Sequence, residues 1–314
     1  MIFTLKIPLM RHLLLAALLL STALSFAEEP KTKKVLFIGL DGTRFDAIEK
    51  AKTPNLHALM NEGIYSDTCL ILDDRYQKSD TVSGPGWSSI LTGVWADKHG
   101  VHDNSFVGSH YKEFPHFFTR LKEVRPEAKT ASYVTWEPIH KLIVSAADET
   151  KNYERKEHAT ADYDNYDHEA AAEAVKMLKD GNPDALFFYV GQIDVAGHTN
   201  GFHPSVPQYI EAIERGDELV GKLVAATKAR PRYDKEDWLV IVTSDHGGKG
   251  TGHGGGHKSP EILNSFLIVS GPSAQRGKFE KQVYLPDAPV TALAHLGVKA
   301  KEEWKLDGRA VGLK

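Results

Sequence analysis

The sequence has little sulfur. Its 314 residues include one cysteine, Cys69, and four methionines. A single thiol cannot form an intrachain disulfide, so the sequence excludes the disulfide-stapled scaffolds common among small secreted proteins. Stability must therefore come from a hydrophobic core, which a chain of this length can build.

Runs of basic residues are also missing. No stretch of Lys and Arg is longer than the short segment Lys31–Lys34, and the formal net charge is −4. Proteins that bind nucleic acid or anionic membranes usually present basic patches. We therefore expect no nucleic-acid-binding surface on this protein.

Long apolar segments are scarce too, and the longest, residues 13–20, lies close to the N-terminus. It follows Lys6 and Arg11 and precedes the small-residue pattern of residues 25–27, which is typical of a signal-peptide cleavage site. The apolar region of about 15 residues is shorter than the roughly 20 that a membrane-spanning helix needs. We predict a secretory signal (residues 1–27) removed after Ala27, a periplasmic or secreted mature protein, and no stable membrane insertion after cleavage. An uncleaved N-terminal anchor is the alternative.

What the sequence does contain is a series of short, nearly continuous apolar segments. Such segments are typical of strands buried on both faces of a parallel sheet. They are residues 33–42, 185–194, 237–247 and 265–271, with a weaker fifth candidate at 128–134.

Helical patterns alternate with these strands, at residues 53–63, 166–179 and 207–227. The alternation predicts an α/β fold, a three-layer sandwich around a mostly parallel central sheet. No linker separates two large domains, so we expect residues 28–314 to form a single catalytic domain. The remaining long segments are predicted to be irregular insertions on one rim: residues 64–82, 102–127 and 135–165.

Three of the four strong strand candidates end in acidic residues. Asp41 ends the first, Asp194 the second, and Asp245 with His246 the third. Sites of open α/β sheets collect at the carboxyl ends of the strands, so these side chains should meet at one rim. Carboxylates brought together repel one another unless a cation lies between them.

Histidines accompany these carboxylates at metal-binding spacings. His198 lies four residues after Asp194, and a glycine-rich segment places His253 and His257 after His246. Mixed imidazole and carboxylate ligands favour zinc over magnesium or calcium. We predict two zinc centres. One would use Asp194, His198 and a later histidine, and the other Asp41, Asp245 and His246.

The segment of residues 81–93 is rich in hydroxyl groups. Ser83 is expected just before a short helix, where its side chain meets free N–H groups and the positive end of the helix dipole. Thr81, Ser88, Ser89 and Thr92 are the competitors, and the last three fall within the helix, where they can bond to its backbone. We expect no base of the Ser-His-Asp kind near Ser83, so a metal ion would have to activate it.

These motifs resemble the alkaline phosphatase superfamily and, within it, the type I phosphodiesterase/nucleotide pyrophosphatase branch. The similarity covers nearly the whole chain after the signal. The matching segments are residues 35–44 (VLFIGLDGTR), 53–63 (TPNLHALMNEG), 83–93 (SGPGWSSILTG), 97–106 (DKHGVHDNSF), 194–201 (DVAGHTNG), 244–248 (SDHGG) and 285–298 (LPDAPVTALAHLGV).

The resemblance implies a two-zinc hydrolase of small-molecule phosphate esters that works through a phosphoserine. Ser83 would be both nucleophile and ligand of the Asp41, Asp245 and His246 centre. Asn104, helped by backbone N–H groups after Ser83, would hold phosphoryl oxygens. For the other centre, the spacing to Pro272 favours His253, and His257 is the alternative. Phosphodiester, pyrophosphate and phosphomonoester substrates all remain open.

Two positions depart from the branch, which usually has Thr as nucleophile and His four residues later. Here these positions are Ser83 and Trp87. A sulfatase of the same fold is one alternative, although Trp87 stands where sulfatases carry arginine. A non-catalytic, metal-holding relative is the other. Trp87, Tyr111 and Trp136 are candidates for lining a substrate pocket, with burial in the core as the alternative.

Overall fold

The computed structural model describes residues 1–2, 30–73, 78–151, 153 and 160–314. All but the first two residues of the expected signal peptide lie outside this range. The chain divides into Met1–Pro30 and Lys31–Lys314, and everything below concerns the second unit. Within the described ranges, no helix is both long enough and apolar enough to cross a bilayer.

The second unit is built on a sheet of nine described strands in the order β4-β3-β5-β1-β6-β7-β2-β8, with β9 also paired to β2. From β4 to β6 all neighbours are parallel, and β7 runs antiparallel to both β6 and β2. The strands are β1 Thr32–Leu40, β2 Ile64–Leu70, β3 Thr130–Tyr133, β4 Glu149–Lys151, β5 Ala185–Val190, β6 Glu236–Thr243, β7 Asn264–Ser270, β8 Gly277–Lys278 and β9 Val283–Tyr284.

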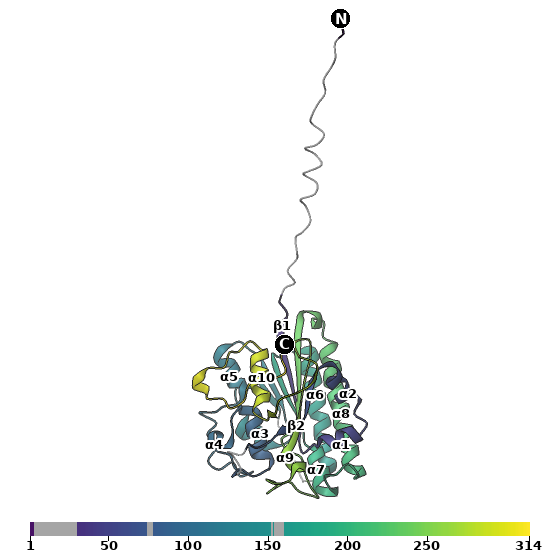
Figure 1. Cartoon of the computed structure of the whole chain (residues 1–314), viewed down its shortest axis with the longest axis vertical. Helices are drawn as coiled ribbons and strands as arrows, with labels where there is room; N and C mark the ends of the chain where they lie inside the picture. The colour runs from purple at the N-terminus through teal and green to yellow at the C-terminus, as the bar shows by residue number, and fades with distance from the viewer. Residues whose placement is uncertain (3–29, 74–77, 152, 154–159) are drawn as a thin grey trace. The chain divides into compact units, whose positions relative to one another are not determined.

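Helices cover both faces of the sheet (Figure 1). One face carries α1 Phe45–Lys50, α2 Pro54–Glu62, α6 Thr160–Asp180, α7 Gln192–Asn200 and α8 Pro207–Lys228. The other carries α3 Ser83–Thr92, α4 Ala96–His99, α5 Phe117–Val124 and α10 Asp287–His295. Shorter elements are α9 Pro260–Leu263 and the single turns Ile139–Ile143, Tyr233–Lys235 and Glu302–Trp304. The predicted three-layer α/β sandwich is confirmed.

The strand β1 shows why the sheet is buried on both sides. Its side chains alternate between faces, as the pleat requires. Leu36 and Ile38 pack in the core under α2, α6 and α8, whereas Val35 and Phe37 pack in the core under α3, α5 and α10. All four are fully buried. The central strand is therefore fixed in register from both faces.

Several boundaries differ from the predictions. Residues 64–70 form strand β2, residues 117–124 form helix α5 and residues 149–151 form strand β4, so all three expected irregular insertions contain regular structure. Strand β5 stops at Val190, and Asp194 lies in the first turn of the following helix rather than at a strand end. The helix begins early because Gly191 already leaves the strand conformation.

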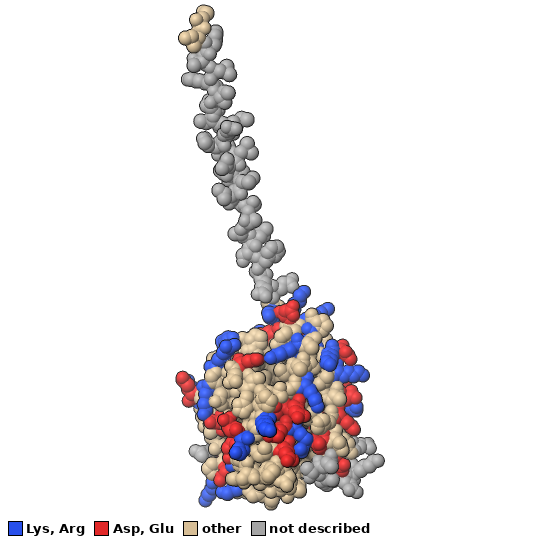
Figure 2. Space-filling model, turned by 90° about the vertical axis from the view of Figure 1, so that its right-hand side faces the viewer, with Lys and Arg blue, Asp and Glu red and all other residues tan. Residues whose placement is uncertain are grey.

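Charges of both signs are interspersed on the face shown in Figure 2, which is the right-hand side of Figure 1, where α1, α2 and α8 lie. Side chains of Lys and Arg alternate there with those of Asp and Glu. That helical face therefore carries a mixed, solvated surface typical of the outer side of an α/β sandwich.

Candidate active site

The candidate site lies at the carboxyl ends of three neighbouring parallel strands, β5, β1 and β6. Asp41 follows β1 directly, and Asp245 and His246 follow β6. Asp194 and His198 lie four residues apart on α7, after β5. In Figure 1, α3, α7 and α9 lie together at this end of the sheet. Residues far apart in the sequence therefore meet at one edge.

Asp41, Asp245 and His246 form a fully buried cluster whose ligand atoms lie within 4.8 Å of one another. The His246 Nε2 atom lies 3.2 Å from Asp245 Oδ2 and 3.6 Å from Asp41 Oδ1. The hydroxyl oxygen of Ser83 lies 3.2 Å from the same ring nitrogen. The three side chains and the serine hydroxyl thus face a common space.

Asp194, His198 and His253 form a second, more open cluster. The two Nε2 atoms of His198 and His253 are 3.0 Å apart, and the Asp194 carboxylate lies 3.4 Å from the first and 3.6 Å from the second. The His198 side chain is 45% exposed and that of His253 only 6%. His257 lies outside the cluster, with its Nε2 atom 2.7 Å from the carbonyl oxygen of Ser79. The structure thus brings His253, rather than His257, to Asp194 and His198.

The three clustered histidines share one hydrogen-bonding pattern. The Nδ1 atom of each lies 2.8–2.9 Å from a backbone carbonyl oxygen, that of Gly247 for His246, Thr81 for His253 and Thr251 for His198. A carbonyl oxygen can only accept, so in the neutral ring Nδ1 donates its proton and Nε2 keeps a lone pair. Metal-binding histidines are oriented in the same way. Each Nε2 lone pair therefore faces carboxylate oxygens that can also only accept.

Burial makes such an arrangement of acceptors costly. Within the two clusters, three buried carboxylate oxygens have no hydrogen-bond partner among the described residues: Asp41 Oδ1, Asp194 Oδ1 and Asp245 Oδ2. Burial raises the pKa of all three carboxyl groups, and repulsion from Asp41 raises the pKa of Asp194 and Asp245 further. These are the same oxygens that face the histidine nitrogens, so the donor set fits a bound metal ion at each cluster.

Burial also determines the charge of two of the rings. It lowers the pKa of His246 and His253 to about 3, and for His253 the neighbouring His246 contributes in the same direction. Both imidazoles are therefore neutral at physiological pH. A neutral ring with a free Nε2 lone pair is the form that binds a metal.

The two clusters are in contact with each other. The rings of His246 and His253 stack with their centroids 3.7 Å apart and their planes 20° apart. Gly42 has a φ of 64°, and a Cβ atom at this position would lie 2.6 Å from Asp194 Oδ1. A Cβ atom at Gly86 would lie 2.9 Å from the Cβ of Asp245. Glycine at both positions lets the backbone approach the clusters closely.

Ser83 is the first residue of α3, and Val82 occupies the cap position before it. The helix thus begins one residue earlier than predicted, and Ser83 is only 7% exposed. A histidine does lie near Ser83, because His246 Nε2 is within hydrogen-bond distance of its hydroxyl. The Nδ1 atom of that ring faces a carbonyl and not a carboxylate, however, so the three groups of a Ser-His-Asp triad are not aligned in the required order.

The backbone after Ser83 also differs from the prediction. The Gly84 N–H donates to Asn104 Oδ1 at 2.6 Å, the Gly86 N–H donates to Val82 O at 3.3 Å, and Pro85 has no N–H. These groups are therefore not free to hold a substrate oxygen. Asn104 is exposed, and because its Oδ1 atom is fixed by Gly84, its amide N–H₂ group remains as the donor at this position.

The other hydroxyl groups of the segment have structural partners. Ser88 and Thr92 bond to helix carbonyls, at 2.5 Å to Gly84 O and 2.7 Å to Ser88 O respectively. Ser89 lies 3.1 Å from a ring nitrogen of His99. Thr81, the remaining competitor, donates its hydroxyl to the carbonyl of His253.

The aromatic candidates fall in two groups. Trp87 is fully buried in the core, and its Nε1–H donates to Asp41 Oδ2 at 2.8 Å, so of the two alternatives for this residue the core position holds. Tyr111 and Trp136 are half-buried, and the Tyr111 hydroxyl lies 2.6 Å from that of Ser88. No role was predicted for Tyr189, whose hydroxyl donates to Asp41 Oδ2 at 2.6 Å. A tyrosine in a buried strand needs a hydrogen-bond partner for its hydroxyl, and this requirement is the feature of the sequence that could have pointed to Tyr189.

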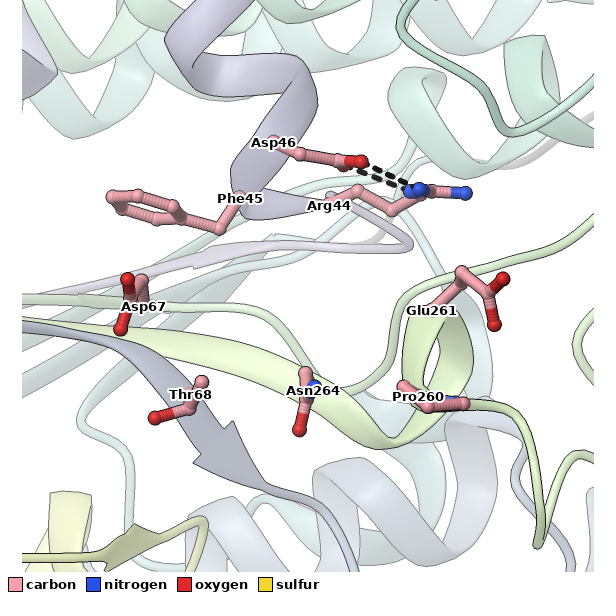
Figure 3. Close-up of a pocket in the computed structure, with 8 residues that line it drawn as sticks. All are labelled: Arg44, Phe45, Asp46, Asp67, Thr68, Pro260, Glu261 and Asn264. Carbon is pink, nitrogen blue, oxygen red and sulfur yellow. Dashed lines mark hydrogen bonds and ion pairs between the residues drawn. The ribbon is translucent and has the colours of Figure 1, made fainter.

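Arg44 connects two loops near the site through hydrogen bonds. It donates to the carbonyls of Phe202 at 2.9 Å and Gly248 at 3.0 Å, and it forms a bidentate pair with Asp46 (Figure 3). It also lines a cavity of about 290 Å³ with Phe45, Asp46, Asp67, Thr68, Pro260, Glu261 and Asn264. None of the clustered ligands lines this cavity, and its arginine is already neutralised, so it is not the centre of the chemistry.

Comparison with known proteins identifies the family of the chain. Residues 35–305 match the family model of type I phosphodiesterase/nucleotide pyrophosphatase. The chain belongs to this family. The resemblance inferred from the sequence motifs is thereby confirmed.

Relatives within the type I phosphodiesterase family are distant. Mouse bis(5'-adenosyl)-triphosphatase ENPP4 is 24% identical over 241 residues, which cover 70% of this chain and 48% of that protein. Rat ectonucleotide pyrophosphatase/phosphodiesterase family member 7 is 25% identical over 238 residues, covering 68% and 49%. The chain thus spans about half the length of these relatives.

Solved structures show the same fold. Murine ectonucleotide pyrophosphatase/phosphodiesterase 5 superposes with a TM-score of 0.65 at 16% identity, covering 86% of this chain and 96% of the other. The Ps i-CgsB structure in complex with a neocarrahexaose gives 0.67 at 19% identity, covering 90% and 76%. A 2-O GAG sulfatase, BT1596, also has this fold, with a TM-score of 0.63 at 12% identity, covering 90% and 73%. The architecture is therefore shared beyond the type I phosphodiesterase family.

Proposed function

We propose that the chain is a two-zinc phosphohydrolase that cleaves phosphodiester or pyrophosphate bonds of small molecules through a phosphoserine at Ser83. The observation that carries the proposal is the pair of acceptor-only clusters beside the Ser83 hydroxyl. Family membership supports the class of bond that is cleaved. Mixed imidazole and carboxylate ligands support zinc as the metal.

Asp41, Asp245, His246 and Ser83 would hold one ion, and Asp194, His198 and His253 the other. Zinc bound there would supply the positive charge that the buried carboxylates lack and lower the pKa of a coordinated hydroxyl or water. Ser83 would attack phosphorus in line with the leaving oxygen, and water would then hydrolyse the phosphoserine. The Asn104 amide would donate to a non-bridging oxygen, since Gly84 already fixes its carbonyl oxygen.

Trp87 bears on the sulfatase alternative. Sulfatase-like proteins share the fold, but a likeness of 12–19% identity shows the fold alone. Here the position where those enzymes carry arginine is a tryptophan buried in the core. No cationic side chain from that position can reach a sulfate group, which favours phosphate esters. A non-catalytic role is disfavoured because both clusters retain their full set of ligand types.

The names of the relatives point to nucleotides: one is a bis(5'-adenosyl)-triphosphatase, and an inactive murine ectonucleotide pyrophosphatase/phosphodiesterase 5 was solved in complex with AMP. We propose a small-molecule phosphodiester or pyrophosphate, such as one that contains a nucleotide, with monoesters as the weaker substrates. We also propose that residues 28–314 act as one catalytic domain in the periplasm or outside the cell after removal of residues 1–27. N-terminal sequencing of the exported protein tests the cleavage.

The decisive experiment compares hydrolysis of bis(4-nitrophenyl) phosphate and 4-nitrophenyl phosphate by protein loaded with two equivalents of zinc. We expect the diester to be the better substrate, and rapid acid quenching followed by peptide mass analysis to find the phosphoryl group on the peptide that contains Ser83. Faster hydrolysis of the monoester would reverse the substrate assignment. Absence of hydrolysis of both, in protein with bound zinc, would refute the catalytic role.

A further inference from the structure

Asp41 is held differently from the other two clustered carboxylates. We propose that Trp87 and Tyr189 are positioning residues that restrict Asp41 to a single metal-binding oxygen. The inference rests on the proposed function, because it concerns the metal that the Asp41, Asp245 and His246 cluster would bind. It gives Trp87, which lies four residues after Ser83, a role that does not involve the substrate.

The two oxygens of Asp41 have opposite environments. Oδ2 accepts a hydrogen bond from the Trp87 indole at 2.8 Å and another from the Tyr189 hydroxyl at 2.6 Å. Oδ1 has no hydrogen-bond partner among the described residues and lies 3.6 Å from His246 Nε2. One oxygen is therefore occupied by two donors, and only the other faces the cluster.

Packing fixes both donors in place. Trp87 is fully buried, and its ring lies against Gly39 so closely that a Cβ atom there would overlap the indole. Tyr189 is the cross-strand partner of Gly39 in β5, and its ring meets that of Trp87 at 5.3 Å and 70°. Phe187 supports the indole from the same strand, with a centroid distance of 6.0 Å. Neither donor can turn away from Asp41 without disturbing the core.

The donors also cannot take on another function. An indole N–H can only donate, and a carboxylate oxygen can only accept, so the Tyr189 hydroxyl 2.6 Å from Asp41 Oδ2 is the donor of that bond. A carboxylate with two free oxygens can bind a cation through both. With Oδ2 occupied, Asp41 offers one oxygen, and space in the cluster remains for the Ser83 hydroxyl, 3.2 Å from His246 Nε2. The pair thus keeps a position beside the nucleophile open.

Tyr189→Phe and Trp87→Phe test the inference, because each removes a donor while retaining an aromatic ring. The chain offers matched controls elsewhere in the core. Trp238 donates from Nε1 to Glu236 Oε2 at 2.7 Å, and Tyr133 donates from its hydroxyl to Glu149 Oε1 at 2.6 Å. Both are almost fully buried, so Trp238→Phe and Tyr133→Phe remove the same kind of bond outside the clusters.

The measurement is stepwise zinc affinity, by competition with a chromogenic chelator, on folded full-length protein. We expect each site variant to bind one of its two zinc ions about 10–100-fold more weakly, as for other second-layer partners of metal ligands, and the other ion unchanged. The controls should keep both affinities while losing comparable thermal stability. Cobalt(II) spectra should show a higher coordination number in the site variants only.

Affinities within twofold of the wild type in both site variants, or equal losses in the controls, would overturn the inference. If Trp87→Phe does not fold, Tyr189→Phe still decides, because it deletes only one oxygen atom. Failure of the wild-type protein to bind two zinc ions would instead contradict the proposed function. The two failures are thus distinguishable.

Discussion

Asp41 and Glu236 lie at opposite ends of neighbouring parallel strands, and each buried carboxylate accepts a hydrogen bond from a buried tryptophan. Glu236 also faces Arg230, which donates twice, at 2.7 and 2.9 Å. Burial alone would raise the pKa of Glu236, but Arg230 and Trp238 bring it below its usual value. The pKa of Asp41 is raised by burial, in spite of its two donors. The difference is the cation Arg230, which accompanies Glu236 and has no counterpart at Asp41 among the described residues.

The same contrast extends to the two ends of the sheet. At the amino ends of β1 and β6, Lys34 lies 4.0 Å from Asp184, and Arg230 pairs with Glu236. At the carboxyl ends, three carboxylates converge on histidines, two of which are buried and neutral. The ion pairs at the amino ends are complete within the chain, whereas the two clusters hold several carboxylates and no cation among the described residues. Converging carboxylates without a partner cation are therefore the mark of the functional end.

The largest expected effect separates two serines, one at each end. Ser83→Ala should lower the rate of phosphodiester hydrolysis by at least about 10³-fold, because it removes the nucleophile. Ser273, whose hydroxyl donates to Asp237 Oδ2 at the amino end of β6, is the control. Initial rates with bis(4-nitrophenyl) phosphate measure both variants. Comparable rates for Ser83→Ala and Ser273→Ala would eliminate Ser83 as nucleophile.

The next prediction concerns metal-free protein, in which two substitutions should change the free energy of unfolding in opposite directions. Glu236→Gln should lower the free energy of unfolding by about 3 kcal/mol, because it leaves Arg230 buried without its counter-charge. Asp245→Asn should raise the free energy by about 1 kcal/mol, because an amide can donate where Asp245 Oδ2 now faces only acceptors.

Denaturant unfolding in the presence of a chelator measures both changes. In the presence of zinc, Asp245→Asn should instead have a lower free energy of unfolding than the wild type, because the variant has lost a metal ligand. Destabilisation of the metal-free protein by Asp245→Asn would break the comparison between the two ends.

Asp167 sharpens the comparison, because it is a buried carboxylate near the site that is satisfied by uncharged donors. It accepts from the Thr135 hydroxyl and from the N–H groups of Gly191 and Gln192 at the start of α7, at 2.6–2.9 Å. Burial raises its pKa to about 7 from an ordinary value of 3.8. The folded state then holds a proton that the unfolded state has lost. Its contribution to stability is full below about pH 4 and is lost as the pH rises through about 7.

Asp167→Asn should therefore remove a slope of up to about 1.4 kcal/mol per pH unit from the stability profile between about pH 4 and 7. Thermal unfolding across this range, in the presence of a chelator, checks the slope. Zinc affinity should stay unchanged, because Asp167 does not contact the clustered ligands. An unaltered pH profile in the variant would show that Asp167 does not titrate in this window.

The smallest expected effect compares two glycines with positive φ. Gly297→Ala should cost about 1 kcal/mol of stability from backbone strain alone, because a Cβ atom there would meet nothing within 4 Å. Gly42→Ala should cost about 1 kcal/mol more, because its Cβ would press on Asp194. Paired chemical unfolding curves measure the difference. Equal costs would show that the backbone at Gly42 has room to move.

The sequence predicted the central strands well, because β1, β5 and β6 are buried on both faces and appear as continuous apolar runs. Strand β2 escaped prediction because its register with β7 shifts between Ser66 and Cys69, which interrupts the alternation that marks a strand. The antiparallel direction of β7 could not be predicted either, since a fully buried strand shows the same pattern in both directions.

The metal-ligand types were predictable, because strand ends place their side chains at one edge whatever the loops do. The choice between His253 and His257 needed the path of the glycine loop, which is fixed by Asp80 and Thr81 through hydrogen bonds to Gly255 and Gly256. The turning of Trp87 and Tyr189 toward Asp41 depends on packing around β1, and no local pattern encodes it.

The position of β1 between β5 and β6 also governs when the protein can assemble. Its partners lie about 150 and 200 residues further along the chain, so the middle of the sheet closes only after most of the polypeptide is available. Asp41 and Ser83 are synthesised early, yet they meet His246 only after β6 has paired. A nascent chain that ends before Asp245 would carry the nucleophile and two of the carboxylates but could complete neither centre.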